Sequence, residues 1–94
     1  MSKVKVHPTD PTMYMFWDVA TNEPNAFYIR DCQPSWVWNE NFEKPTVSPS
    51  VLLTRSNGFR NHCFIKDGKL QYLSDCTHSL AGQTVDMVDF PDDW

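Results

Sequence analysis

The sequence predicts a single small domain that is mainly β, or α+β with little helix. Aromatic residues are 14% of the chain and supply large side chains for a core, while seven Pro against three Gly favour stiff connections over long helices. We expect a compact antiparallel sheet of about six short strands, as a small barrel or sandwich, with one short C-terminal helix. The domain spans 1–94, and both 1–12 and the acidic tail 86–94 are candidate peripheral segments.

Four apolar segments are the first candidate strands. They are 13–17, 26–30, 35–38 and 46–54. In the third segment, Trp36 and Trp38 share one face because side chains alternate along a strand. In the fourth, Pro49 cannot donate a hydrogen bond to a neighbouring strand, so this segment is an edge strand or contains a bulge.

Two serines, Ser48 and Ser50, flank that proline. Serine can act as a nucleophile, but no G-x-S-x-G motif surrounds either residue. We therefore assign both hydroxyls to hydrogen bonds with the local backbone and predict no catalytic serine.

The dipeptide Asp67-Gly68 predicts the turn of a β-hairpin. It is a favoured two-residue type I′ loop, in which both residues take positive φ. This turn sets the register, which pairs Lys66 with Lys69, Ile65 with Leu70, Phe64 with Gln71, Cys63 with Tyr72 and His62 with Leu73. Because side chains alternate, Cys63 lies on the face expected to form the core, whereas His62 and Phe64 lie on the opposite face.

The hairpin register also relates His62 to an acidic residue. Asp75 lies two residues beyond Leu73, so it is a diagonal neighbour of His62 on the same face. Diagonal neighbours in a sheet are within reach of long side chains or of a shared ion. His62 and Cys63 point to opposite faces, so the pair expected to act together is His62 with Asp75.

The segment Ser74–Gly82 predicts the short C-terminal helix. Asp75 suits the N-cap, and Gly82 suits the position just after the helix. In one interpretation Asp75 simply accepts the backbone N–H of His78 as a cap. In the other, His62, Asp75, Cys76 and His78 converge on a zinc ion, a donor set that suits this metal. The spacing leaves both interpretations open.

Charge and composition narrow the classes of partner. The net charge is −4, and residues 61–94 carry two basic against six acidic side chains. With no basic cluster, direct binding to nucleic acid is not expected, although an acidic protein can occupy a basic surface of another protein. We see no apolar run long enough to span a membrane and no secretory signal, so we expect a cytoplasmic location with reduced thiols.

Aromatic side chains are the candidate binding residues. Trp36 and Trp38 fit the core or an exposed recognition surface, and the tail offers Phe90 and Trp94 to the domain or to a partner. Exposed tryptophans or an open sheet edge would also favour a homodimer.

Two long segments resemble a family of small proteins common in bacteriophages and prophages. They are WVWNENFEKPTVSPSVLL at Trp36–Leu53 and HCFIKDGKLQYLSDCTHSLAGQTVDM at His62–Met87. The matching pattern reads H-x-F, then G, then DCTH-x-LAGQTV, and some members of the family are labelled ammonia monooxygenases. The resemblance implies a phage origin and no particular activity.

This chain departs from the family at three cysteine positions. Members typically carry a Cys-Pro-Gly-Cys knuckle where this chain has residues 18–21, and a Cys where it has Asn61. A thiolate-rich zinc site is therefore expected to be absent or rebuilt. Of the possible ligands, only His62, Asp75 and His78 carry over.

The sequence leads to a non-enzymatic phage accessory protein as the first functional hypothesis. Such a protein would bind and modulate a host protein, for example to counter a defence system. The alternative is a small zinc-binding protein or metal-dependent hydrolase that uses His62, Asp75 and His78. The first hypothesis predicts a host partner in a pull-down, and the second predicts bound zinc.

Overall fold

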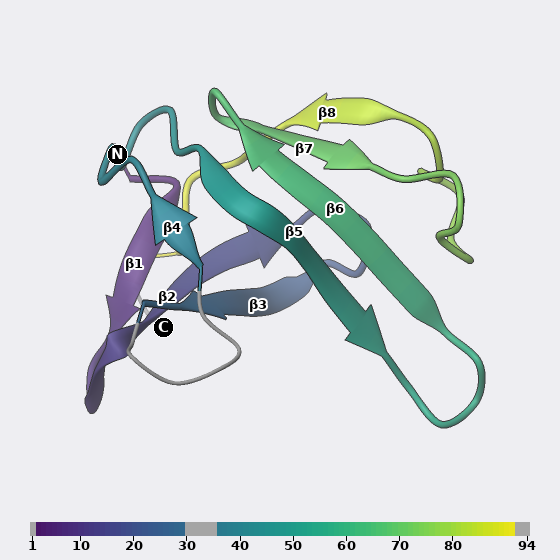
Figure 1. The fold of residues 1–94 in the computed structure, drawn as a ribbon, viewed down its shortest axis with the longest axis horizontal. Helices are drawn as coiled ribbons and strands as arrows, with labels where there is room; N and C mark the ends of the chain where they lie inside the picture. The colour runs from purple at the N-terminus through teal and green to yellow at the C-terminus, as the bar shows by residue number, and fades with distance from the viewer. Residues whose placement is uncertain (1, 30–35, 92–94) are drawn as a thin grey trace.

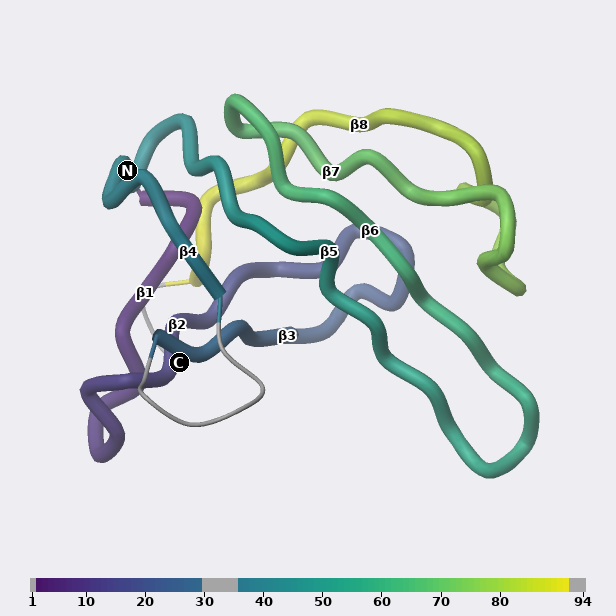
Figure 2. The backbone as a smooth tube through the Cα atoms, viewed as in Figure 1, coloured from purple at the N-terminus to yellow at the C-terminus, as the bar shows by residue number. Residues whose placement is uncertain are grey.

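Two antiparallel β-sheets make up the computed structural model, which describes residues 2–29 and 36–91 (Figure 1, Figure 2). The first sheet has the order β1-β2-β3 and contains β1 (Val4–His7), β2 (Asp10–Asp18) and β3 (Glu23–Tyr28). The second has the order β4-β5-β6-β7-β8 and contains β4 (Val37–Trp38), β5 (Val47–Thr54), β6 (Arg60–Lys66), β7 (Lys69–Tyr72) and β8 (Thr84–Asp86). The expected antiparallel β architecture is confirmed, with eight strands rather than about six.

The two sheets share one core. Phe16 and Phe27 from the first sheet are fully buried against Ile65, Leu70 and Tyr72 from the second. Alternation along each strand sends these side chains inward and leaves the outer faces polar or partly exposed. Two separate sheets packed in this way correspond to the sandwich alternative rather than to a closed barrel.

The two ends of the described chain contribute to this packing. Val4 on β1 belongs to the core with 1% of its surface exposed, and Phe90 is 4% exposed. The backbone N–H of Phe90 donates to the carbonyl of Ser2, which brings both ends of the described chain together. Trp94 lies outside the described residues.

The hairpin formed by β6 and β7 confirms the predicted register. Lys66 pairs with Lys69, Ile65 with Leu70, Phe64 with Gln71 and Cys63 with Tyr72. Asp67 and Gly68 both have positive φ, of 51° and 76°, as a type I′ turn requires. The predicted core face and outer face of this hairpin therefore follow from two turn residues.

The predicted helix over Ser74–Gly82 is wrong. This segment is a series of turns, and the described residues contain no helix. Among these residues there is therefore no helix long and apolar enough to cross a membrane. Thr77 in this segment pairs with β6: it donates its backbone N–H to the carbonyl of Arg60, and its Oγ1 accepts the N–H of Arg60. These bonds replace the i→i+4 bonds that a helix would make.

A bulge interrupts β5 where Pro49 was expected to disturb the sheet. Val47 pairs with Ile65 and Val51 pairs with Cys63, so three residues of β5 lie opposite Phe64 alone. The Ser48–Pro49 peptide bond within this bulge is cis. The irregularity carries Ser50 out of the regular pairing and toward the outer face of the second sheet.

Candidate functional site

Ser50 and His62 meet on the outer face of the second sheet. The Oγ of Ser50 lies 2.7 Å from Nε2 of His62, a hydrogen-bond distance. His62 is on β6, opposite Leu52 of β5, and Ser50 is the last residue of the bulge, two residues before Leu52. A serine hydroxyl in contact with an imidazole nitrogen is the arrangement of an activated nucleophile and its general base.

Asp75 completes the group. Its Oδ2 lies 3.2 Å from Nδ1 of His62, and Arg60 Nη1 lies 3.6 Å from the same oxygen. The hydrogen bond from His62 holds the pKa of the Asp75 carboxyl below its usual range, with a smaller contribution from the charge of Arg60. Since an ionised carboxylate only accepts, Nδ1 of His62 carries the proton and Nε2 is left to accept the hydroxyl proton of Ser50.

Cys76 holds the backbone of His62 in place. Its Sγ lies 3.2 Å from both the backbone nitrogen and the backbone oxygen of His62, so the thiol accepts one hydrogen bond and donates another. The His62 carbonyl also accepts the backbone N–H of Leu73, so the thiol adds to the hydrogen bonds that hold β6 just beyond the end of β7. We assign Cys76 a positioning role rather than a ligand role.

The group formed by Ser50, His62 and Asp75 is called the triad below. A buried hydrogen-bond network lies directly behind it. Asp18, at the end of β2, has no exposed surface, and it accepts hydrogen bonds from Tyr72 Oη at 2.6 Å, from the backbone of Ala20 and from the side chains of Asn25 and Asn61. Asn61 precedes His62 on β6. The network therefore ties the first sheet to the strand that carries His62.

His78 belongs to this network and not to the triad. Its Nε2 donates to Oδ1 of Asn61 at 3.0 Å, and its Nδ1 accepts the backbone N–H of Leu80 at 3.2 Å. Its ring also packs edge-on against Tyr72, with 4.8 Å between centroids. The structure therefore separates His78 from His62 and Asp75, which the zinc interpretation had grouped together.

The four predicted zinc ligands are engaged in hydrogen bonds in this structure. Both ring nitrogens of His62 and both of His78 are engaged in hydrogen bonds, and the Cys76 thiol is turned to the His62 backbone. Within 2–29 and 36–91, no group of three or more His, Cys, Asp or Glu side chains is placed to hold a metal ion. Zinc binding stays a prediction of the sequence.

The candidate binding aromatics are mostly built into the protein. Trp36 donates its indole N–H to the carbonyl of Ser50 at 3.2 Å, and so supports the nucleophile's backbone. Trp38 packs against Tyr14, with 4.7 Å between ring centroids, and Phe90 packs edge-on against Trp17. None of these contacts indicates a free recognition surface.

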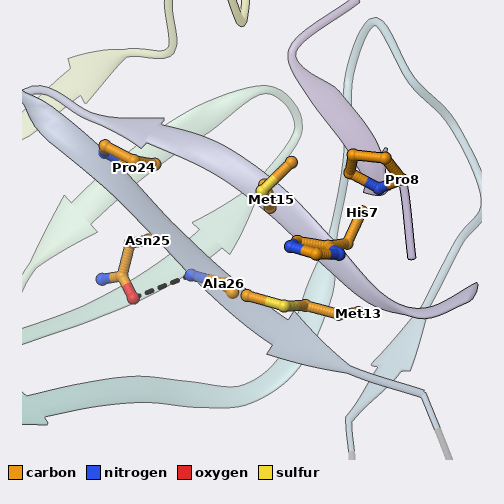
Figure 3. A pocket seen from close by; sticks show the side chains of 7 residues that line it. All are labelled: His7, Pro8, Met13, Met15, Pro24, Asn25 and Ala26. Carbon is orange, nitrogen blue, oxygen red and sulfur yellow. Dashed lines mark hydrogen bonds between the residues drawn. The ribbon is translucent and has the colours of Figure 1, made fainter. Parts of the chain in front are cut away.

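A separate cavity of about 390 Å³ lies on the first sheet. Figure 3 shows the ring of His7 and the side chains of Met13 and Met15 gathered at this cavity, with Pro24 and Ala26 along β3. The Nδ1 of His7 is engaged by Thr9. This cavity and the triad are on different sheets, so it plays no part in the chemistry of Ser50.

Ser50 is the functional residue that sequence reasoning missed. It has no sequence motif of its own, because it reaches His62 through a bulge and a cross-strand neighbour. The pairing of β5 with the hairpin could have identified Ser50. When Leu52 lies opposite His62, the serine two residues earlier lies on the same face of the sheet as Leu52.

The protein matches a known family over its central region. The model of BubE, described as the bacterial ubiquitination-like system serine protease, matches residues 24–73, just over half of the chain. That region includes Ser50 and His62, and Asp75 follows it by two residues. No curated protein and no solved structure matches the chain. The chain belongs to the BubE family.

Proposed function

We propose that this protein is a serine protease that acts within a bacterial ubiquitination-like system. The observation that carries the proposal is the Ser50–His62–Asp75 group, with 2.7 Å and 3.2 Å between its members. The description of the family supports the same chemistry. A triad is recognised by geometry and roles rather than by motif or chain order, so the lack of a G-x-S-x-G sequence does not weigh against it.

The proposed reaction begins with attack by Ser50. Its Oγ bonds to the carbonyl carbon of the substrate amide while the hydroxyl proton moves to Nε2 of His62. Asp75 accepts from Nδ1 and stabilises the imidazolium that forms. His62 then gives this proton to the leaving nitrogen, the C–N bond breaks, and the acyl group stays on Ser50.

Hydrolysis restores the enzyme by the same route. A water molecule attacks the acyl carbon and transfers a proton to Nε2 of His62. The bond between Oγ and the acyl carbon breaks, the carboxylic acid leaves, and His62 returns the proton to Ser50. Atoms and protons balance without a further reactant.

A fluorophosphonate probe tests this proposal. Such a probe bonds to a serine hydroxyl only where a neighbouring base activates it. We expect one adduct in the folded protein, on the peptide that contains Ser50, and no adduct in Ser50→Ala or His62→Ala. Ser56→Ala, an exposed serine in the loop after β5, is the matched control and keeps the adduct. An unlabelled Ser50 in folded protein would overturn the proposal.

We propose that a host protein, if the predicted phage origin holds, is engaged as a substrate. The predicted accessory role and cytoplasmic location stay predictions of the sequence. A pull-down with Ser50→Ala should retain an uncleaved partner that the active protein releases as fragments. Recovery of the same intact partner with both forms would favour the non-enzymatic binding role instead.

A further inference from the structure

A groove begins beside the triad on the outer face of the second sheet. A cavity of about 300 Å³ is lined by Thr46, Ser48, Phe64, Lys66 and Gln71 together with backbone of β5 and β6. Phe64 is two residues from His62 on the same strand and therefore shares its face. The groove therefore lies on the same face of the second sheet as the site of the proposed reaction.

The bulge in β5 creates this groove. Because three residues of β5 lie opposite Phe64 alone, the strand arches away from β6 at this point. The Phe64 side chain is left 39% exposed, although a large aromatic group is usually covered. The same distortion therefore positions Ser50 and opens an apolar surface next to it.

A second cavity extends the groove across the sheet. It has a volume of about 200 Å³ and shares Lys66 and Gln71 with the first cavity, ending at Thr84 on β8. Phe64 pairs with Gln71, and Gln71 pairs with Thr84, so these side chains form one row over three neighbouring strands. Figure 1 shows β6, β7 and β8 side by side along this path.

Three charged residues line the second cavity: Lys66, Asp67 and Lys69. Among the residues that the structure describes, Lys66 forms no ion pair, whereas Lys69 is paired with Asp86. The groove therefore presents an aromatic ring close to the triad and an unpaired ammonium group farther from it. A peptide that fits both features of the groove carries an apolar side chain and, farther along, a carboxylate.

We propose that this groove is the substrate-binding cleft for an extended peptide with a large apolar residue next to the scissile bond and an acidic residue farther along. The first cavity has room for a large apolar side chain, which would pack on Phe64. The acidic residue would reach the ammonium group of Lys66. This inference rests on the proposed protease function and adds the class of sequence that it cleaves.

Cleavage of a fluorogenic peptide panel tests the charge preference. Peptides differ by Glu, Gln or Lys at successive positions on both sides of the scissile bond. Exposed ion pairs are weak, so we expect a preference for Glu over Lys of about threefold to fivefold in kcat/KM at one position. Lys66→Glu should reverse this preference, and Lys5→Glu on β1, which makes the same charge change on the other sheet, should leave it unchanged.

The same panel tests the apolar subsite. Phe64→Ala should lower kcat/KM for peptides with a large apolar residue by about tenfold, the effect of losing part of a buried aromatic contact. Leu52→Ala is the matched control, because Leu52 is also exposed beside His62 but lines neither cavity. A larger loss in Leu52→Ala would place the substrate on the other side of His62 and overturn the inference.

Labelling of Ser50 by the fluorophosphonate separates the two proposals. If Ser50 is unreactive in the unsubstituted protein, the protease function itself fails. If Ser50 is labelled at the same rate in every variant while Phe64→Ala and Lys66→Glu leave peptide selection unchanged, the groove assignment fails and the protease function stands. Lys66 is exposed, so its substitution remains informative even where Phe64→Ala unfolds.

Discussion

The side-chain amide of Asn61 donates a hydrogen bond to the buried carboxylate of Asp18, 43 residues earlier in the chain. This bond joins the last residue of β2 to the residue that precedes His62 on β6. The same buried network includes Tyr72, which donates to Asp18, and His78, which donates to Asn61.

Replacing Asp18 should destabilise the fold. In Asp18→Ala the buried donors of Asn61 and Tyr72 lose their acceptor, and each unsatisfied group costs about 1–3 kcal/mol. We expect the free energy of unfolding, measured by urea denaturation, to fall by roughly 3 kcal/mol or more. Asp75→Ala is the control and should hardly move the midpoint, since Asp75 is exposed. Equal midpoints for the two variants would contradict the network's role.

Replacing Asp75 should affect the rate instead of the stability. Asp75→Asn removes the carboxylate that orients Nδ1 of His62, and the loss in kcat at a comparable triad is on the order of 10⁴-fold. Because its folded pKa is lowered, Asp75 stays ionised as pH falls below the usual carboxyl range, and its stabilising bond to His62 is lost only on further acidification. Peptide turnover in Asp75→Asn, with Asp10→Asn as the control, checks the expected loss.

Tyr72 should resist ionisation while the protein is folded. Burial and the hydrogen bond to Asp18 raise the pKa of its phenol above the usual value of 10.0. An unfolded chain loses this proton near pH 10, so above that pH the unfolded state binds fewer protons and stability falls as pH rises. Tyrosinate absorbance compared between the unsubstituted protein and Tyr72→Phe should show no difference near pH 10.5 when folded, and a difference of about three-quarters of a tyrosinate in urea. A folded-state difference would contradict this burial.

Gly68 should tolerate a methyl group less well than Gly58. Both have positive φ, of 76° and 89°, so alanine is strained at either position by about 1–2 kcal/mol. A Cβ on Gly68 would also lie 3.2 Å from the backbone of Glu43 and Lys44, whereas nothing lies within 4 Å at Gly58. We expect a lower melting temperature for Gly68→Ala than for Gly58→Ala. The reverse order would indicate that the 43–45 segment moves freely.

The hairpin and its two faces were predictable because local chemistry determines them. Asp67 and Gly68 accept positive φ, and the register of β6 and β7 then follows residue by residue. The pairing of His62 with Asp75 came from the same register and is present in the structure. The helix prediction failed because capping signals around Asp75 and Gly82 are also turn signals, and bonds from Thr77 to β6 decided between them.

The sequence by itself determined a β-rich domain, the type I′ hairpin, an irregular or edge position at Pro49 and the His62–Asp75 pair. These follow from φ preferences, the missing N–H of proline and alternation along a strand, all of which act over a few residues. Only the tertiary structure decided that Ser50 reaches His62 and that His78 turns to Asn61. It also decided that Asp18, on the first sheet, accepts a hydrogen bond from Asn61. Those contacts join residues 12 to 43 positions apart, and they form because packing two sheets on one core brings distant strands together.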